Sequence, residues 1–347
     1  MLSLENLLES VDQTLESAVA MGSDSERVSL AAKLFLGFDA MRAAPEPFDR
    51  TRFVALCADA VRSASLAASK LHLAPHDASD GTVSGTSRDD YAAFVGDLYA
   101  ACWRDYTSEE YEATVRIFLD RLVQNGVDVD LAGLRAADIG CGSARNTVAL
   151  VRLGAREAVG LDFSEAAISD ARARIAALPE ASRIRLVTGS ATALPPEWGE
   201  RFDFVVSNGV VHHTPDPQRG VREVGRILRR GGRAFFMVYG QGGLFWGLTE
   251  RLRQLLGSVS PRTAHEVLTA LGVSVHKRFF CLDHWFTIYQ EQVSRAEFEH
   301  RLSAAGFGEL KYLGRGAAHD STERLTRYPD EADLIGEPDM RYVATRI

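Results

Sequence analysis

A glycine turn between an apolar segment and a helix start constrains the fold of this chain more than any other feature. Residues 136–147 read AADIGCGSARNT, and residues 159–164 read VGLDFS. The first stretch predicts a short buried strand, a Gly-x-Gly turn at Gly140 and Gly142, and the beginning of a helix. The second predicts another strand that ends in Asp162, twenty residues after Gly142. We therefore expect parallel strands joined by a helix, as in an open α/β sheet.

This spacing indicates a site for an adenosine-bearing cofactor. Glycine lets the backbone approach a ligand closely, and a helix that begins after the turn presents free N–H groups. Asp162 is placed to accept hydrogen bonds from both ribose hydroxyls. The third glycine of the dinucleotide fingerprint is replaced by Arg145. Asp138 would repel a pyrophosphate but suits a cation, such as an ammonium group near a sulfonium. A nicotinamide-dependent dehydrogenase is therefore the weaker interpretation.

At residues 138–142, which read DIGCG, the chain resembles the class I S-adenosylmethionine-dependent methyltransferases, whose first motif is Asp-x-Gly-x-Gly. The resemblance continues in order over residues 108–347, with a gap at 241–293. It implies an α/β fold with a seven-stranded Rossmann-like sheet, the cofactor S-adenosyl-L-methionine and the product S-adenosyl-L-homocysteine. The cofactor residues that it implies are Asp138, Gly140, Cys141, Gly142, Asn146, Asp162, Phe163, Ser190, Ala191, Asn208 and Gly209. Family members often carry an aspartate where this chain has Ser190.

Two adjacent histidines follow the expected fourth strand, where the family pattern faces the cofactor pocket. His212 and His213 carry imidazoles, which titrate near neutral pH and can remove a proton from an amine, a hydroxyl or an acidic carbon. Because the methyl donor is already activated, alignment of nucleophile, carbon and sulfur is the main task. We expect in-line displacement in which one histidine, preferably His212, removes a proton or positions the substrate. The alternative is that one ring only packs structurally.

The methyl acceptor is expected to meet aromatic side chains on both sides of the first motif. The candidate substrate residues are Trp103, Tyr106, Arg145, Tyr239, Trp246 and Trp285. Residues 241–293 are expected to form a lid inserted between the fifth and sixth strands, and a dimer contact is the competing interpretation. Aromatic residues at helical spacing, such as those before residue 108, equally predict packing on the core.

Changes in composition along the chain predict its domains. Apolar residues recur at helical spacing over residues 1–72, which predicts an N-terminal helical domain. Residues 73–88 are rich in Pro, Gly, Asp, Ser and Thr without apolar periodicity and predict a linker. The methyltransferase core is then expected over residues 89–240 and 294–347. A homodimer would use the N-terminal helices or the insertion.

The overall composition limits the possible functions. A formal net charge of −8 argues against broad binding to the phosphate backbone of DNA. Four scattered cysteines predict neither a metal site nor a disulfide framework. The sequence shows no signal-peptide pattern and no membrane-length apolar run, so a cytoplasmic protein is expected.

The sequence therefore predicts a methyltransferase that acts on a nitrogen or oxygen, or else a carbon, of a small molecule. One alternative is a methyltransferase acting on tRNA or protein, for which salt-dependent RNA binding would be the sign. Another is a catalytically silent cofactor-binding or scaffold protein with the same fold. The acceptor, the acting histidine, the oligomeric state and the role of the N-terminal domain stay open at this point.

Overall fold

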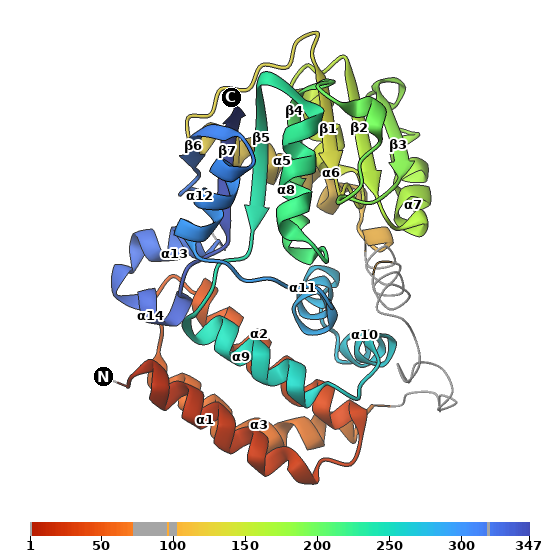
Figure 1. Ribbon diagram of the computed structural model, residues 1–347. Helices are drawn as coiled ribbons and strands as arrows, with labels where there is room; N and C mark the ends of the chain where they lie inside the picture. Colours follow the sequence, from red (N-terminus) through yellow and green to blue (C-terminus); the bar gives the residue numbers. More distant parts are fainter. Residues whose placement is uncertain (1, 72–95, 97–102, 318–319) are drawn as a thin grey trace. The chain divides into compact units, whose positions relative to one another are not determined.

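The computed structural model describes residues 2–71, 96, 103–317 and 320–347, and the chain divides into two compact units (Figure 1). The helical unit comprises Met1–Cys102, Gly242–Thr287 and Arg324–Gly336. The sheet unit comprises Trp103–Gln241, Ile288–Glu323 and Glu337–Ile347. The predicted linker over residues 73–88 lies outside the described residues, as does the beginning of the predicted core before residue 96.

The sheet unit contains a seven-stranded sheet with the order β3-β2-β1-β4-β5-β7-β6. Its strands are β1 (Arg135–Ile139), β2 (Glu157–Asp162), β3 (Ile184–Thr188), β4 (Phe202–Asn208), β5 (Leu228–Val238), β6 (Phe307–Tyr312) and β7 (Met340–Arg346). β1–β5 are parallel to one another, whereas β7 runs antiparallel to both β5 and β6. The α/β fold with a Rossmann-like seven-stranded sheet is therefore confirmed.

Helices cover both faces of this sheet because side chains alternate along each strand. Ala136 and Phe235 join a core with apolar residues of the helices α5 (Ser108–Gln124), α6 (Arg145–Arg152) and α7 (Glu165–Ile175). Ala137 and Phe236 join the opposite core with α8 (Pro217–Ile227) and α12 (Arg295–Ala304). α5 begins with a capping box, in which the Thr107 hydroxyl accepts from the Glu110 N–H at 3.2 Å. The result is a three-layer α/β/α arrangement.

Strand order brings the motif loops to one edge of the sheet. Because β1, β2, β4 and β5 are parallel, their carboxyl ends meet at the same edge. The order reverses between β1 and β4, which is the switch point where open α/β sheets bind ligands. The turn after β1 is tied to β2 by the N–H groups of Gly140 and Cys141, which donate to the Leu161 carbonyl at 2.7 and 2.9 Å.

The helical unit is assembled from segments that are far apart in the sequence. Its helices are α1 (Leu4–Ser17), α2 (Asp24–Ala43), α3 (Arg50–Ala68), α9 (Gly243–Leu255), α10 (Pro261–Ala270), α11 (Val275–Phe286) and α14 (Ala332–Ile335), and α13 (Ser321–Arg327) crosses a unit boundary. Phe35 is fully buried, with its ring centroid 5.7 Å from that of Phe245 and 4.9 Å from that of Phe280. Residues 242–287 of the predicted insertion thus share a core with the N-terminal helices, while the role of residues 241–293 as a lid stays a prediction. None of the described helices is both long and apolar enough to cross a membrane.

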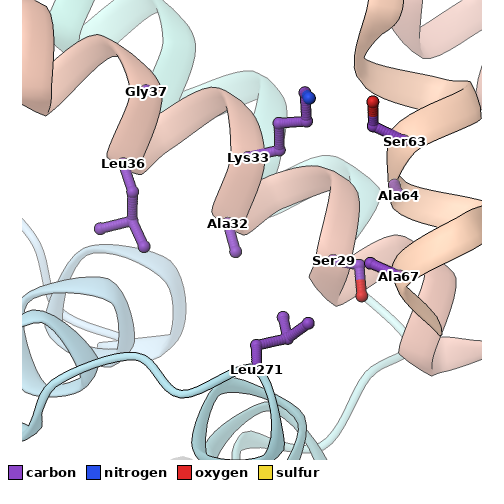
Figure 2. A pocket seen from close by; sticks show the side chains of 9 residues that line it. All are labelled: Ser29, Ala32, Lys33, Leu36, Gly37, Ser63, Ala64, Ala67 and Leu271. Carbon is purple, nitrogen blue, oxygen red and sulfur yellow. The ribbon is translucent and has the colours of Figure 1, made fainter. Parts of the chain in front are cut away.

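A pocket of about 460 Å³ opens within the helical unit, between α2, α3 and the end of α10 (Figure 2). It is lined by Ser29, Ala32, Lys33, Leu36, Gly37, Ser63, Ala64, Ala67 and Leu271. The side chains are mostly small and apolar, and the Lys33 ammonium is ion-paired with Asp59 at 3.3 Å. The pocket therefore has mostly apolar walls, and the charge of Lys33, the one cationic residue among those that line it, is balanced by Asp59.

Candidate active site

The glycine turn after β1 has a backbone conformation that glycine adopts more readily than other residues. Gly140 has φ 72° and Gly142 has φ 49°, both in the left-handed region. A Cβ atom added at Gly140 would lie 2.3 Å from a methyl carbon of Val210, so the loop after β4 packs directly on the turn. α6 then begins at Arg145. The turn and helix start therefore have the geometry that the sequence predicted.

Asp162 lies at the end of β2 with its carboxylate fixed by two backbone N–H groups. Gly142 donates to Oδ2 at 2.8 Å, and Ser164 donates to Oδ1 at 3.0 Å. The side chain is buried, and this burial raises the pKa of Asp162. The next residue, Phe163, keeps 54% of its surface exposed. A fixed carboxylate beside an exposed aromatic ring fits a ribose that carries a planar base.

Asp138 is completely buried in β1, with one oxygen bonded and the other not. The Thr147 hydroxyl of α6 donates to Oδ2 at 2.7 Å. Oδ1 has no hydrogen-bond partner among the residues that the structure describes, and burial raises the pKa of this carboxyl to about 6. The hydroxyl oxygens of Ser143 and Ser207 are likewise buried and unbonded within that part of the chain. Since buried polar atoms normally have partners, this edge fits a ligand with a polar or cationic end.

The other predicted cofactor residues lie on the same edge or on the loops that follow it. Cys141 is buried, which raises the pKa of its thiol, so a role as nucleophile is disfavoured. The Ser190 hydroxyl is exposed and accepts from the Thr192 N–H at 3.2 Å. The remaining positions are Asn146, buried in α6, Ala191, half-buried after β3, Asn208, at the end of β4, and Gly209, whose N–H donates to Met237 at 3.1 Å.

Three of the predicted substrate residues gather over the glycine turn. The Arg145 guanidinium carbon lies 4.2 Å from the centroid of the Trp103 ring, and the rings of Trp103 and Tyr106 are 6.1 Å apart. A Cβ at Gly142 would meet the Trp103 indole at 3.8 Å. Arg174 of α7 donates to the carbonyls of Trp103 and Tyr106 at 3.1 and 3.0 Å, which holds the segment in place. The aromatic residues before α5 therefore cover the turn.

The two histidines lie in a short 3-10 helix (Val211–His213) after β4, beside Tyr239. The ring of His212 is buried, with its centroid 4.1 Å from the rings of both His213 and Tyr239. His213 is half-buried, and its Nδ1 lies 2.8 Å from the Tyr289 carbonyl oxygen. Because a carbonyl only accepts, Nδ1 carries the proton, and a neutral His213 ring then has its lone pair on Nε2.

The remaining two predicted substrate residues belong to the helical unit and not to this edge of the sheet. Trp246 and Trp285 are buried there, with ring centroids 5.0 Å from Phe245 and 5.6 Å from Phe35, respectively. In the sheet unit, sequence reasoning missed Arg174 and Tyr289. Tyr289 contacts His213 through its backbone carbonyl, so its residue type gave no signal. Arg174 has only the ordinary pattern of a charged helix face.

Comparison with known proteins gives a partial match over the sheet unit. A family described as a methyltransferase domain matches residues 137–236. The ubiquinone biosynthesis O-methyltransferase of Stutzerimonas stutzeri is 33% identical over 108 residues, 31% of this chain and 45% of that protein. The enzyme of the same name from Nitrosococcus oceani is 36% identical over 106 residues, 30% of this chain and 44% of that protein. The chain thus spans less than half the length of these relatives.

Among solved structures, the magnesium protoporphyrin IX methyltransferase of Synechocystis with bound S-adenosylhomocysteine is similar at 16% identity and a TM-score of 0.45. That similarity covers 75% of this chain and 98% of the other. The family match falls on the part of the sheet unit that carries the Asp-x-Gly-x-Gly turn, the acid at the end of β2 and the loop after β4. Residues 137–236 therefore match a methyltransferase domain, and the motifs and strand order of the sheet unit are those of a class I S-adenosylmethionine-dependent methyltransferase.

Proposed function

We propose that this protein methylates a hydroxyl oxygen of a small aromatic molecule, with His213 as the general base. The observation that carries this proposal is the hydrogen bond from His213 Nδ1 to the Tyr289 carbonyl at 2.8 Å. It fixes the tautomer in which Nε2 accepts a proton. When bound, S-adenosylmethionine supplies the methyl group, which passes to the acceptor oxygen while the sulfonium becomes the neutral thioether of S-adenosylhomocysteine.

The residues at the edge of the sheet would hold this cofactor. Asp162 would accept hydrogen bonds from the ribose, and Phe163 would pack against the adenine. The backbone at Gly140 and Gly142 leaves room for close approach to the methionyl part. Asp138, with one buried oxygen unbonded in the described part of the chain, would offer negative charge to the ammonium end.

The acceptor would lie against the aromatic side chains that border this edge. His212 and Tyr239 present rings beside His213, and their burial gives them fixed positions. A flat aromatic acceptor would pack on such rings while its hydroxyl donates to His213 Nε2. The proton then leaves the oxygen as it becomes a nucleophile, and a positioned base of this kind contributes about 10²- to 10⁴-fold in rate. The two relatives are O-methyltransferases of ubiquinone biosynthesis, which supports an oxygen acceptor.

The test is transfer of a labelled methyl group to a panel of phenols, aliphatic alcohols and aromatic amines. We expect phenols to be methylated and His213→Gln to lower kcat by about 10²-fold or more. His300→Gln, an exposed histidine on α12, is the matched control and should keep full activity. Transfer only to tRNA, to protein or to amines would refute the proposal, as would a fully active His213→Gln enzyme.

A further inference from the structure

We propose that Glu291 and Arg301 are positioning residues that hold the ring of His213 in its reactive tautomer through the segment 288–293. This inference rests on the proposed role of His213 as the base. The segment, which we call the strap, belongs to the sheet unit and runs from Ile288 to the start of α12. It contacts the loops after both β4 and β5, the two loops that carry the proposed catalytic and acceptor-binding side chains.

Every second residue of the strap makes a hydrogen bond to these loops. The Tyr289 carbonyl accepts from His213 Nδ1 at 2.8 Å, and the Glu291 N–H donates to the His212 carbonyl at 2.9 Å. The Val293 N–H donates to the Tyr239 carbonyl at 3.3 Å. The bonded residues are two positions apart, as in extended backbone, where the polar groups of alternate residues point to the same side. The strap therefore holds His212, His213 and Tyr239 in position together.

The strap is anchored by a two-point ion pair to α12. Arg301 donates from Nη1 to Glu291 Oε2 at 2.6 Å and from Nη2 to Oε1 at 2.9 Å. Such parallel bonds fix geometry better than a single contact does. α12 is itself fixed, because Phe298 and Leu302 are buried in the core beneath the sheet. Arg301 also pairs with Glu297 on the same helix, so it is held from both sides.

This anchor matters because the strap is the point at which the chain returns from the helical unit, whose last residue before it is Thr287. The Tyr289 carbonyl is two residues from Glu291, so loss of the Glu291 side chain would leave the acceptor of the His213 proton held by the backbone hydrogen bonds of the strap alone. His213 would then exchange tautomers and ring orientations. Only the Nδ1-protonated form offers Nε2 to the acceptor hydroxyl, so the reactive fraction of the enzyme would fall.

The experiment compares Glu291→Ala with Glu297→Gln, which removes the other carboxylate on Arg301 but leaves the strap anchored. The full-length protein, labelled with ¹⁵N-histidine and saturated with S-adenosylhomocysteine, is examined by NMR for the protonation of each His213 ring nitrogen. His213→Gln identifies the signal. We expect the wild type and Glu297→Gln to show Nδ1 protonated, and Glu291→Ala to show a mixture of tautomers.

In steady-state kinetics with a methylated phenol, Glu291→Ala should lower kcat about fivefold, the equivalent of about 1 kcal/mol. Its KM for S-adenosylmethionine should not change, and Arg301→Lys, which keeps the charge but not the paired bonds, should lower kcat less. A single Nδ1-protonated tautomer in Glu291→Ala would overturn the proposal, and so would an equal loss in Glu297→Gln. If the tautomer responds as expected but the wild type methylates no phenol, the positioning role is supported and the proposed function is the part that fails.

Discussion

Replacing Asp162 by asparagine tests the cofactor site most directly. The carboxylate accepts from the N–H groups of Gly142 and Ser164, one on each oxygen. An amide of the same shape has only one accepting oxygen, so its NH₂ group would face one of these donors. In the proposed complex the same side chain also accepts from the ribose hydroxyls. Asp162→Asn therefore removes charge and acceptors without removing volume.

The magnitude follows from the kind of hydrogen bond that is lost. A hydrogen bond to a charged group is worth about 1.5–3 kcal/mol, and each 1.4 kcal/mol is tenfold in affinity. Loss of one such bond to the ribose should weaken binding of S-adenosylhomocysteine by about 10- to 150-fold. The burial that raises the pKa of Asp162 keeps water from replacing the lost contact.

Isothermal titration calorimetry with S-adenosylhomocysteine measures this loss. Asp130→Asn is the matched control, because Asp130 is an exposed aspartate that accepts one backbone hydrogen bond, from Ala132 at 2.9 Å. We expect unchanged binding in the control and a stoichiometry near one per chain. Thermal unfolding of both variants separates a binding defect from loss of fold. An Asp162→Asn protein that is folded and binds as tightly as the wild type would refute the assignment of Asp162 to the ribose.

Three further predictions concern stability. In urea titrations, Gly140→Ala should lower the free energy of unfolding by about 2 kcal/mol more than the control Gly133→Ala. Both glycines have positive φ, but only Gly140 lacks space for a Cβ atom. Equal losses in the two variants would contradict this prediction. Burial raises the pKa of Asp138 from 3.8 to about 6. Between pH 3.8 and pH 6 the carboxyl is therefore protonated in the folded state but ionised in the unfolded state. Unfolding should therefore cost about 1 kcal/mol more at pH 5 than at pH 7 from this group alone, and Asp138→Asn should remove that increment; an unchanged slope would contradict it. Phe35→Ala should destabilise the helical unit by about 3–5 kcal/mol, measured by hydrogen exchange over residues 243–286. The control Leu66→Ala, at an exposed site, should change little. If residues 243–286 keep their protection in Phe35→Ala, the shared core is contradicted.

The sequence predicted those parts of the site whose chemistry is local. The strand, turn and helix around Gly140 follow from residues within a dozen positions, because positive φ and helix starts are set by near neighbours. The position of Asp162 follows from the parallel pairing of β1 and β2, in which Asp138 lies beside Gly160. The spacing between the two motifs in the sequence already implied this pairing. The seven-stranded sheet was predicted from the family resemblance, because strands such as β6 (FGELKY) and β7 (MRYVATR) are too mixed in polarity to count from the sequence alone.

The parts that could not be predicted depend on contacts between distant segments. Trp246 and Trp285 lie in helices whose apolar faces are evident from the sequence, but periodicity does not say which partner covers a face. Their partners include Phe35, more than two hundred residues away in the chain. The strap was missed for a different reason, because Tyr289 orients His213 through a carbonyl that every residue type possesses.

The assembly of the helical unit from separated segments has a consequence for its synthesis. The faces of α1–α3 are covered in part by α9 and α11, which lie about 170 residues further along the chain. At a translation rate of about 5–20 residues per second, the first three helices leave the ribosome about 9–34 s before synthesis of those partners begins. During that interval the nascent chain exposes Phe35 and its neighbours, while the parallel strands of the sheet unit are completed. The five parallel strands, the last of which ends at Val238, are therefore expected to pair first, and the N-terminal helices to need protection by chaperones until residue 286 has emerged.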